Sequence, residues 1–121
     1  MKAIFDTNIL VDYLRGFEEA KAELTRYEGA GISLITWMEI LVGADDESEE
    51  QQLREFLLRF DRIDVNQAIA ERAVKIRMRE RVRLPDAVIL ATAEQTSSLL
   101  VTRNVKDFSV DNPQVRVPYE L

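Results

Sequence analysis

The sequence predicts an α/β fold in which a central, mostly parallel β-sheet is flanked by helices on both faces. Short apolar runs of strand length alternate with longer segments whose apolar residues recur at helical spacing. Residues 84–95 are apolar almost all round, which is typical of a helix buried between layers. Strands that alternate with helices favour a parallel sheet, because each crossover helix packs back onto it.

The first half of the chain supplies two strand and helix units. An apolar run, KAIF, precedes a segment whose apolar residues follow helical spacing, and two glycines separate this unit from the next apolar run, ISLIT. The expected elements are a strand at 2–5, a helix at 7–14, an amphipathic segment at 18–28, a strand at 32–36 and a helix at 36–44.

The second half continues the alternation. Leu53, Phe56, Leu57 and Phe60 form one helical stripe, and the runs SLLVT and VRVP have strand character. The expected elements are a helix at 49–61, a short strand at 63–65, helices at 67–82 and 84–95, and strands at 98–102 and 115–118. We detect no linker or internal repeat, so we expect one domain over residues 1–121.

Composition restricts the chemistry that the chain can perform. Its 121 residues contain no Cys and no His, which excludes thiol nucleophiles, imidazole catalysis and the usual zinc sites. The 22 Asp and Glu residues suit a hard cation such as Mg²⁺ or Mn²⁺. The sequence has no signal-peptide pattern and no apolar run long enough to cross a bilayer, so we expect a cytoplasmic protein.

Four acidic residues follow predicted strands or begin the helices after them: Asp6, Glu39, Asp86 and Asp107. Each has a local alternative role. Asp6 suits a helix N-cap, Glu39 a capping box with Thr36, Asp86 the positive end of a helix dipole, and Asp107 a turn. These roles do not explain why all four fall at one edge of a parallel sheet. Gathered carboxylates repel one another unless a divalent cation lies among them.

The chain resembles the PIN-domain ribonucleases, and most closely the VapC toxins of type II toxin–antitoxin pairs. The resemblance runs from FDTNILVDYL through SLITWMEILVGA and LPDAVILATA to LLVTRNVKDF. It implies a PIN-like three-layer fold. It also implies that Asp6, Glu39, Asp86 and Asp107 bind metal and are catalytic. Three residues are expected to support them, namely Asn8, Thr102 and Asn104. In relatives an acid lies nearer the place of Asn104, so Asp107 and Asn104 are alternatives for the fourth position.

The implied activity is that of an endoribonuclease which hydrolyses RNA phosphodiester bonds with Mg²⁺ or Mn²⁺. The resemblance further implies an RNA substrate such as tRNA or rRNA, a VapB-like antitoxin, a homodimer, no membrane contact and no DNA binding by this chain alone. The antitoxin would lie in an apolar groove. Candidate groove residues are Leu10, Tyr13, Leu14, Phe17, Leu53, Phe56, Leu57 and Phe60.

A formal net charge of −6 is unusual for an RNA-binding protein, but the charge is unevenly distributed. Residues 71–83, ERAVKIRMRERVR, contain six basic and two acidic side chains and lead into Asp86. They could form a basic rim around an acidic centre, or a solvated helix face with ion pairs.

Two other classes of protein share some of these features. A receiver-like phosphotransfer domain also places acids at strand ends, with a lysine nearby for which Lys106 is the candidate. A PIN-fold binding module that has lost activity is the second alternative.

Overall fold

The structure is a computed structural model that describes residues 2–121. At its centre is a five-stranded sheet with the strand order β3-β2-β1-β4-β5. Every neighbouring pair of strands is parallel, which confirms the predicted parallel sheet. The strands are β1 (Lys2–Phe5), β2 (Gly29–Ser33), β3 (Asp61–Ile63), β4 (Leu99–Val101) and β5 (Val115–Arg116).

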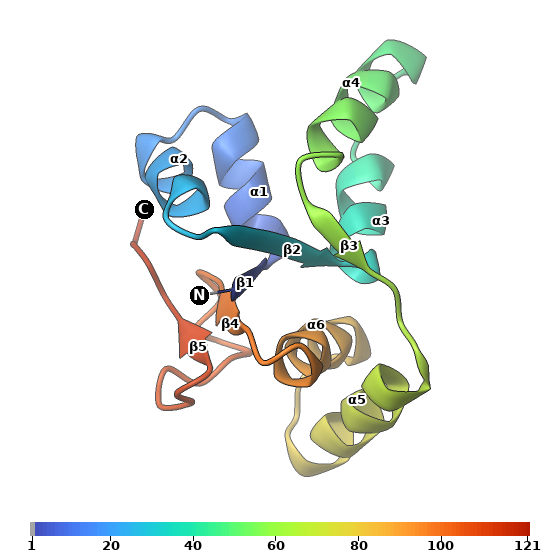
Figure 1. Ribbon diagram of the computed structural model, residues 1–121, viewed down its shortest axis with the longest axis vertical. Coiled ribbons are helices and arrows are strands. Elements are labelled where there is room, and N and C mark those ends of the chain that lie inside the picture. The colour runs from blue at the N-terminus through green and yellow to red at the C-terminus, as the bar shows by residue number, and fades with distance from the viewer. Residues whose placement is uncertain (1) are drawn as a thin grey trace.

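Helices cover both faces of this sheet (Figure 1). Helices α1 to α4 lie on one side, and α5 and α6 lie on the other. The helices are α1 (Thr7–Leu14), α2 (Glu18–Thr25), α3 (Leu34–Val42), α4 (Glu47–Leu57), α5 (Gln67–Arg79) and α6 (Leu84–Gln95). Within residues 2–121, no helix combines the length and apolar character needed to cross a membrane.

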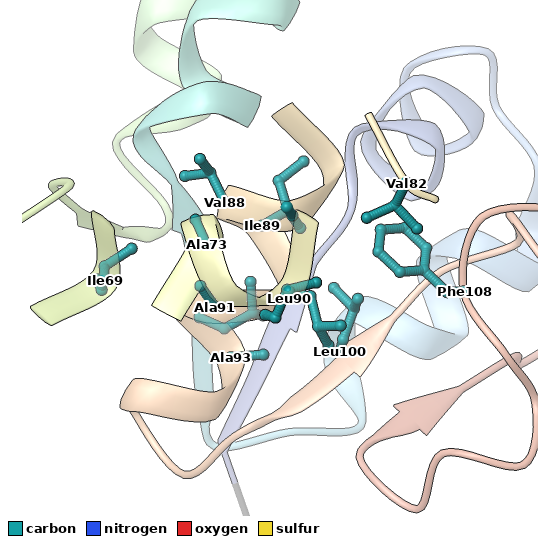
Figure 2. Close-up of a cluster of buried hydrophobic side chains, with 13 residues drawn as sticks. Ile69, Ala73, Val82, Val88, Ile89, Leu90, Ala91, Ala93, Leu100 and Phe108 are labelled. Carbon is teal, nitrogen blue, oxygen red and sulfur yellow. The ribbon is translucent and has the colours of Figure 1, made fainter. Parts of the chain in front are cut away.

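Helix α6 forms the centre of one of the two hydrophobic cores (Figure 2). Every residue from Asp86 to Ala93 is buried, as the apolar character of this segment predicts. Ile69 and Ala73 of α5 pack on α6 from outside, while Leu100 of β4 packs from the sheet. Each fully buried Ile or Leu side chain in this core stabilises the fold by roughly 1.5–3 kcal/mol. The start of α6 is therefore held firmly at the edge of the sheet.

The second core lies on the opposite face of the sheet. Ala3 and Phe5 of β1 point into it, whereas Ile4 between them points towards α6. This alternation follows from the period of two along a strand. Ile9 and Leu10 of α1 complete the contact with β1, so α1 is fixed directly after the first strand.

The second strand begins earlier than the sequence predicts, at Gly29 instead of residue 32. The two glycines are part of the strand and do not precede it. A Cβ atom at Gly31 would lie 2.9 Å from Ile4 Cδ1 and 3.0 Å from Ile63 Cδ1, so the close approach of β1 and β3 favours glycine here. The strand ends at Ser33, whose hydroxyl accepts a hydrogen bond from the Ile35 N–H and caps α3.

Other predicted boundaries shift by a few residues. The third strand covers Asp61–Ile63 instead of 63–65, because α4 already ends at Leu57. Helix α5 ends at Arg79, three residues before the predicted end. The type and order of the predicted elements are otherwise those of the structure.

Candidate active site

Asp6 lies at the carboxyl end of β1 and is only 4% exposed. Its Oδ1 accepts a hydrogen bond from the Thr7 N–H at 2.8 Å, so Asp6 also caps α1. Its Oδ2 accepts from the Thr102 hydroxyl at 2.7 Å and from the Asn8 side-chain amide at 3.2 Å. These neutral donors orient the carboxylate but leave its charge unpaired. The helix-cap role and a role in the site are therefore compatible.

Thr102 and Asn8, two of the residues expected to support the site, connect β1 to the end of β4. Thr102 is fully buried, and its hydroxyl oxygen accepts from the Asn8 amide at 3.3 Å and from the Asn104 N–H at 2.9 Å. The side-chain oxygen Oδ1 of Asn8 accepts from the backbone N–H of Arg103 at 3.1 Å. The loop after β4 is thus tied to Asn8, two residues after Asp6.

Glu39 reaches the same edge of the sheet from the middle of α3. Its Oε1 accepts a hydrogen bond from the Thr7 hydroxyl at 2.6 Å, and that hydroxyl lies 3.1 Å from the Thr36 hydroxyl. The capping box of Thr36 and Glu39 is wrong, because Ser33 caps this helix and Thr36 lies inside it.

Glu39 is exposed, although its neighbours in sequence, from Trp37 to Val42, are apolar and would by themselves suggest an apolar environment. Its apolar neighbours in sequence point in other directions around the helix, where successive residues are about 100° apart. Ile40, for example, is buried in the second core.

Asp86 is buried in the first turn of α6, directly after Pro85. Its Oδ2 lies 3.3 Å from both Nε and Nη2 of Arg83. Arg83 is the residue that precedes α6, and its side chain is 77% exposed. The helix dipole and this ion pair both favour the charged form of Asp86.

Asp107 and Asn104 lie in the loop after β4 and bind each other. The Asn104 amide donates to Asp107 Oδ2 at 2.8 Å, and the Asp107 N–H donates to Asn104 Oδ1 at 3.2 Å. Asp107 Oδ2 also lies 3.9 Å from Arg83 Nη2. The two alternatives for the fourth position thus bind each other beside Asp86.

One cleft of about 310 Å³ collects these groups at the carboxyl edge of the sheet. Three of the four predicted acids line it, namely Asp6, Glu39 and Asp86. Asn104 lines it too, whereas Asp107, which accepts a hydrogen bond from Asn104, is not part of the lining. The basic residues at its wall are Arg15, Arg83 and Arg103. Acids from three separate segments therefore face one space, with basic groups around them.

The electrostatics of the cleft follow from burial and from its shared negative charge. Burial is the largest influence on Asp6 and raises the pKa of its carboxyl to about 6, although hydrogen bonds from Thr102 and Thr7 oppose this rise. The nearby Asp86 and Glu39 raise it further. Burial also raises the pKa of Asp86 despite the Arg83 guanidinium.

Asp107 differs from these carboxyls. Its hydrogen bond with Asn104 is the main influence and lowers the pKa of its carboxyl. Asp107 therefore ionises more easily than Asp6 and Asp86.

These residues fit a hard divalent cation. Asp6 and Glu39 form no ion pair with any residue of the described chain, and a cation near them would relieve the unfavourable charge of buried Asp6. As they stand, no three acidic side chains within residues 2–121 form a complete metal-binding group. Mg²⁺ commonly binds through one or two carboxylates and keeps several waters, so an incomplete carboxylate set suits it.

Sequence reasoning missed two features of this edge. The first is Thr7, whose hydroxyl joins the segment of Asp6 to Glu39. The second is the ion pair of Asp12 with Arg103. Asp12 is 1% exposed, and its Oδ2 and Oδ1 lie 2.5 Å from Arg103 Nε and 2.8 Å from Arg103 Nη2, respectively. Tyr119 donates a further hydrogen bond to Asp12 at 2.8 Å. In the sequence, the one signal for this pair was a charged residue, Asp12, on the buried side of α1.

Comparison with known proteins agrees with this geometry. The profile of the PIN domain matches residues 3–110. The chain belongs to the PIN domain family. This confirms the resemblance inferred from the sequence motifs, and the parallel sheet with helices on both faces is a PIN-like fold.

Several solved structures are similar to this PIN domain, and one of them is a toxin–antitoxin complex. A chain of a toxin–antitoxin complex from Klebsiella pneumoniae is 48% identical, with a TM-score of 0.92, and the match covers 99% of this chain and 100% of that one. A chain of FitAcB from Neisseria gonorrhoeae is 25% identical, with a TM-score of 0.79 and coverage of 98% and 99%. A chain of VapBC2 from Rickettsia felis, in a structure bound to a promoter DNA fragment, is 21% identical and shows the same fold, with a TM-score of 0.82 and coverage of 96% and 98%. A comparison with curated proteins gave no match.

Proposed function

We propose that this PIN domain, formed by residues 1–121, is an endoribonuclease that hydrolyses RNA phosphodiester bonds with Mg²⁺ or Mn²⁺. The observation that carries the proposal is that Asp6, Glu39 and Asp86 line one cleft although they come from distant segments. Raised pKa values at Asp6 and Asp86 indicate negative charge that a divalent cation would stabilise.

The proposal gives each acid of the site a role. A divalent cation at Asp6 and Asp86 would lower the pKa of a bound water and offset negative charge at the phosphate. Glu39, oriented by the Thr7 hydroxyl, would align the attacking water. Asp107, held by Asn104, would act through outer-shell waters or a second ion. Thr102 and Asn8 would keep Asp6 in place.

RNA would approach through the basic wall of the cleft. Arg15 is exposed there, and Arg103 is held by its ion pair with Asp12. Around α5 the side chains of Lys75, Arg77 and Arg81 are exposed, and none of these three is ion-paired within residues 2–121. Arginine and lysine side chains supply the phosphate contacts of most nucleic-acid-binding proteins. The basic segment 71–83 would therefore contribute to substrate binding despite the acidic net charge.

We also propose that the chain is the toxin of a toxin–antitoxin pair, with a VapB-like antitoxin as partner and a homodimer as its assembly. The solved structures named above include toxin–antitoxin complexes. Of the candidate groove residues, Leu14 and Phe17 are 43% and 39% exposed, so apolar surface is available to a partner. Leu10, Leu57 and Phe60 are buried and belong to the core.

Tyr13 and Phe56 are half-buried, and their rings stack with centroids 5.3 Å apart. Size-exclusion chromatography of the chain alone and co-expressed with a neighbouring antitoxin tests both assemblies. In such a complex, the antitoxin would make the contacts with promoter DNA, and this chain alone would bind no DNA.

A receiver-like phosphotransfer domain is not supported. The chain belongs to another family, and the lysine that this alternative requires, Lys106, is exposed and does not line the cleft. A PIN-fold module without activity remains as an outcome of the test below.

The proposed activity is tested with purified protein and labelled RNA in Mg²⁺, in Mn²⁺ and in EDTA. We expect cleavage with either metal, none in EDTA, and none with Asp6→Asn. The matched control is Asp111→Asn, which removes an exposed carboxylate that does not line the cleft and should leave cleavage unchanged. Equal cleavage by Asp6→Asn and wild type would overturn the proposal. No cleavage of tRNA, rRNA or single-stranded RNA by wild type would favour the inactive binding module.

A further inference from the structure

Arg83 is the one basic residue within residues 2–121 that forms an ion pair with any of the four predicted acids. Its guanidinium bridges two of them, with Nη2 at 3.3 Å from Asp86 Oδ2 and 3.9 Å from Asp107 Oδ2. The contact arises from chain direction, because Arg83 lies just before the first turn of α6 and Asp86 lies within that turn. Arg83 therefore stands on the side of the cleft where Asp86 would meet a cation.

The contact is built so that it can be released. The Arg83 side chain is 77% exposed, whereas that of Asp86 is 10% exposed. An ion pair with one such exposed partner contributes little net stability, because solvent screens it and the long side chain loses freedom. Both Arg83 nitrogens near Asp86 lie 3.3 Å from the same oxygen, so the pair is not a two-oxygen fork. Arg83 forms no hydrogen bond or ion pair with Asp6 or Glu39.

A guanidinium and a divalent cation at Asp86 repel each other. A unit charge about 6 Å from a doubly charged ion in water changes the affinity of that ion by roughly tenfold. The ion would therefore bind more weakly while Arg83 contacts Asp86. Once bound, the ion would favour conformations in which the Arg83 side chain turns to solvent. The exposed position of Arg83 allows this movement without disturbing the core.

We propose that Arg83 is an internal counter-ion of the active site, which stabilises Asp86 and Asp107 in the metal-free protein and must be displaced by the divalent cation. Arg83 thereby sets the metal affinity of the site. This inference rests on the proposed function, since it requires that the cleft binds a divalent cation.

Titration of the metal-free chain of residues 1–121 with Mn²⁺, followed by electron paramagnetic resonance of free Mn²⁺, tests the inference without RNA. We expect Arg83→Gln to bind Mn²⁺ about tenfold more tightly than wild type at low salt, with a smaller gain at high salt. Arg83→Lys keeps the charge and should stay within about threefold of wild type. The matched control is Arg81→Gln, which makes the same charge change two residues away at an exposed side chain without an ion pair to the acids.

The outcomes separate this inference from the proposed function. Wild-type binding of Mn²⁺ with no gain in Arg83→Gln, or with an equal gain in Arg81→Gln, overturns the counter-ion role and leaves the nuclease proposal intact. Absence of Mn²⁺ binding by wild type overturns the metal site, and with it this inference. Melting curves in EDTA check folding, and we expect Arg83→Gln to melt at or slightly below the wild-type temperature because Asp86 loses its partner.

Discussion

The Thr102 hydroxyl donates a 2.7 Å hydrogen bond to Oδ2 of Asp6, and it does so across two neighbouring strands. Both residues stand at the carboxyl ends of their strands, and Thr102 is fully buried. The same hydroxyl oxygen accepts from the Asn104 N–H. One buried side chain thus fixes the first acid of the cleft and the loop that carries the fourth.

Replacing Thr102 by valine keeps the shape of the side chain but removes this hydroxyl. Asp6 then loses a donor and the Asn104 N–H loses its acceptor, so we expect a loss of roughly 1–3 kcal/mol in the free energy of unfolding. We also expect about 10- to 100-fold slower RNA cleavage, as for other residues that orient metal ligands. Urea unfolding and cleavage rates measure the two effects.

Thr102→Ser is the control, because it keeps the hydroxyl. It should retain most of the activity and lose only the stability of a buried methyl group, about 1 kcal/mol. Equal activity of the valine and serine variants would contradict the orienting role of Thr102.

The metal-free protein should become less stable as pH rises through the titration of Asp6. Its pKa is raised from 3.8 to about 6 in the folded state, so the folded state binds more protons between these values and stability falls across this window. At pH 7 the penalty in the free energy of unfolding is about 3 kcal/mol. Asp6→Asn removes it while keeping a good helix cap.

In EDTA, Asp6→Asn should therefore be more stable than wild type at pH 7 and similar to it at pH 4. Thermal melts over this pH range measure the difference, with Asp111→Asn as the matched control. If Asp6→Asn instead melted well below wild type at pH 7, the helix cap would be the dominant role of Asp6.

The buried ion pair of Asp12 and Arg103 should stabilise the fold with the opposite dependence on pH. Burial opposes ionisation of Asp12, but hydrogen bonds from Arg103 and Tyr119 outweigh it and lower the pKa of this carboxyl. Its contribution is present above the unfolded value near 3.8 and is lost as pH falls further. We expect Asp12→Asn to cost about 3 kcal/mol at pH 7, since it leaves Arg103 unpaired.

Chemical denaturation at pH 7 and at pH 3 measures this cost, which should shrink at the lower pH. Tyr119→Phe removes one hydrogen bond and should cost about 1 kcal/mol. A cost of Asp12→Asn that is the same at both pH values would show that packing, and not charge, accounts for it.

Thr7 should matter for activity more than for stability. Its hydroxyl donates to Glu39 at 2.6 Å, and both residues are accessible to solvent, which can replace the bond in the folded protein. Thr7→Val should lower the cleavage rate about 10- to 100-fold and change the free energy of unfolding by less than about 1 kcal/mol. Single-turnover cleavage measures the rate, and Thr7→Ser, which keeps the hydroxyl, should restore it.

The sequence was most informative where one local rule sufficed. Asp6 follows an apolar strand directly, and Asp86 lies in the first turn of a helix that is apolar almost all round. Parallel strands bring such positions to one edge of the sheet, so their neighbourhood could be predicted from order alone. The extent of β2 could not be predicted in this way. The need for glycine at position 31 comes from the side chains of Ile4 and Ile63 on the neighbouring strands.

Contacts between distant segments explain the other differences. The exposure of Glu39 depends on which way its helix faces, and its hydroxyl partner Thr7 is 32 positions away. Arg83 is close to Asp86 in sequence, but its second partner, Asp107, comes from the loop after β4. Such pairings require the assembled fold and have no periodic signal in the chain.

The most direct test of the proposed metal site is a crystal soaked in Mn²⁺, with an anomalous difference map measured near the manganese edge. We expect a peak in the cleft within about 2.0–2.3 Å of carboxylate oxygens of Asp6 and Asp86, and no such peak in crystals of Asp86→Asn. A cleft without a peak at an Mn²⁺ concentration that supports RNA cleavage would contradict the assignment of Asp6 and Asp86 as metal ligands.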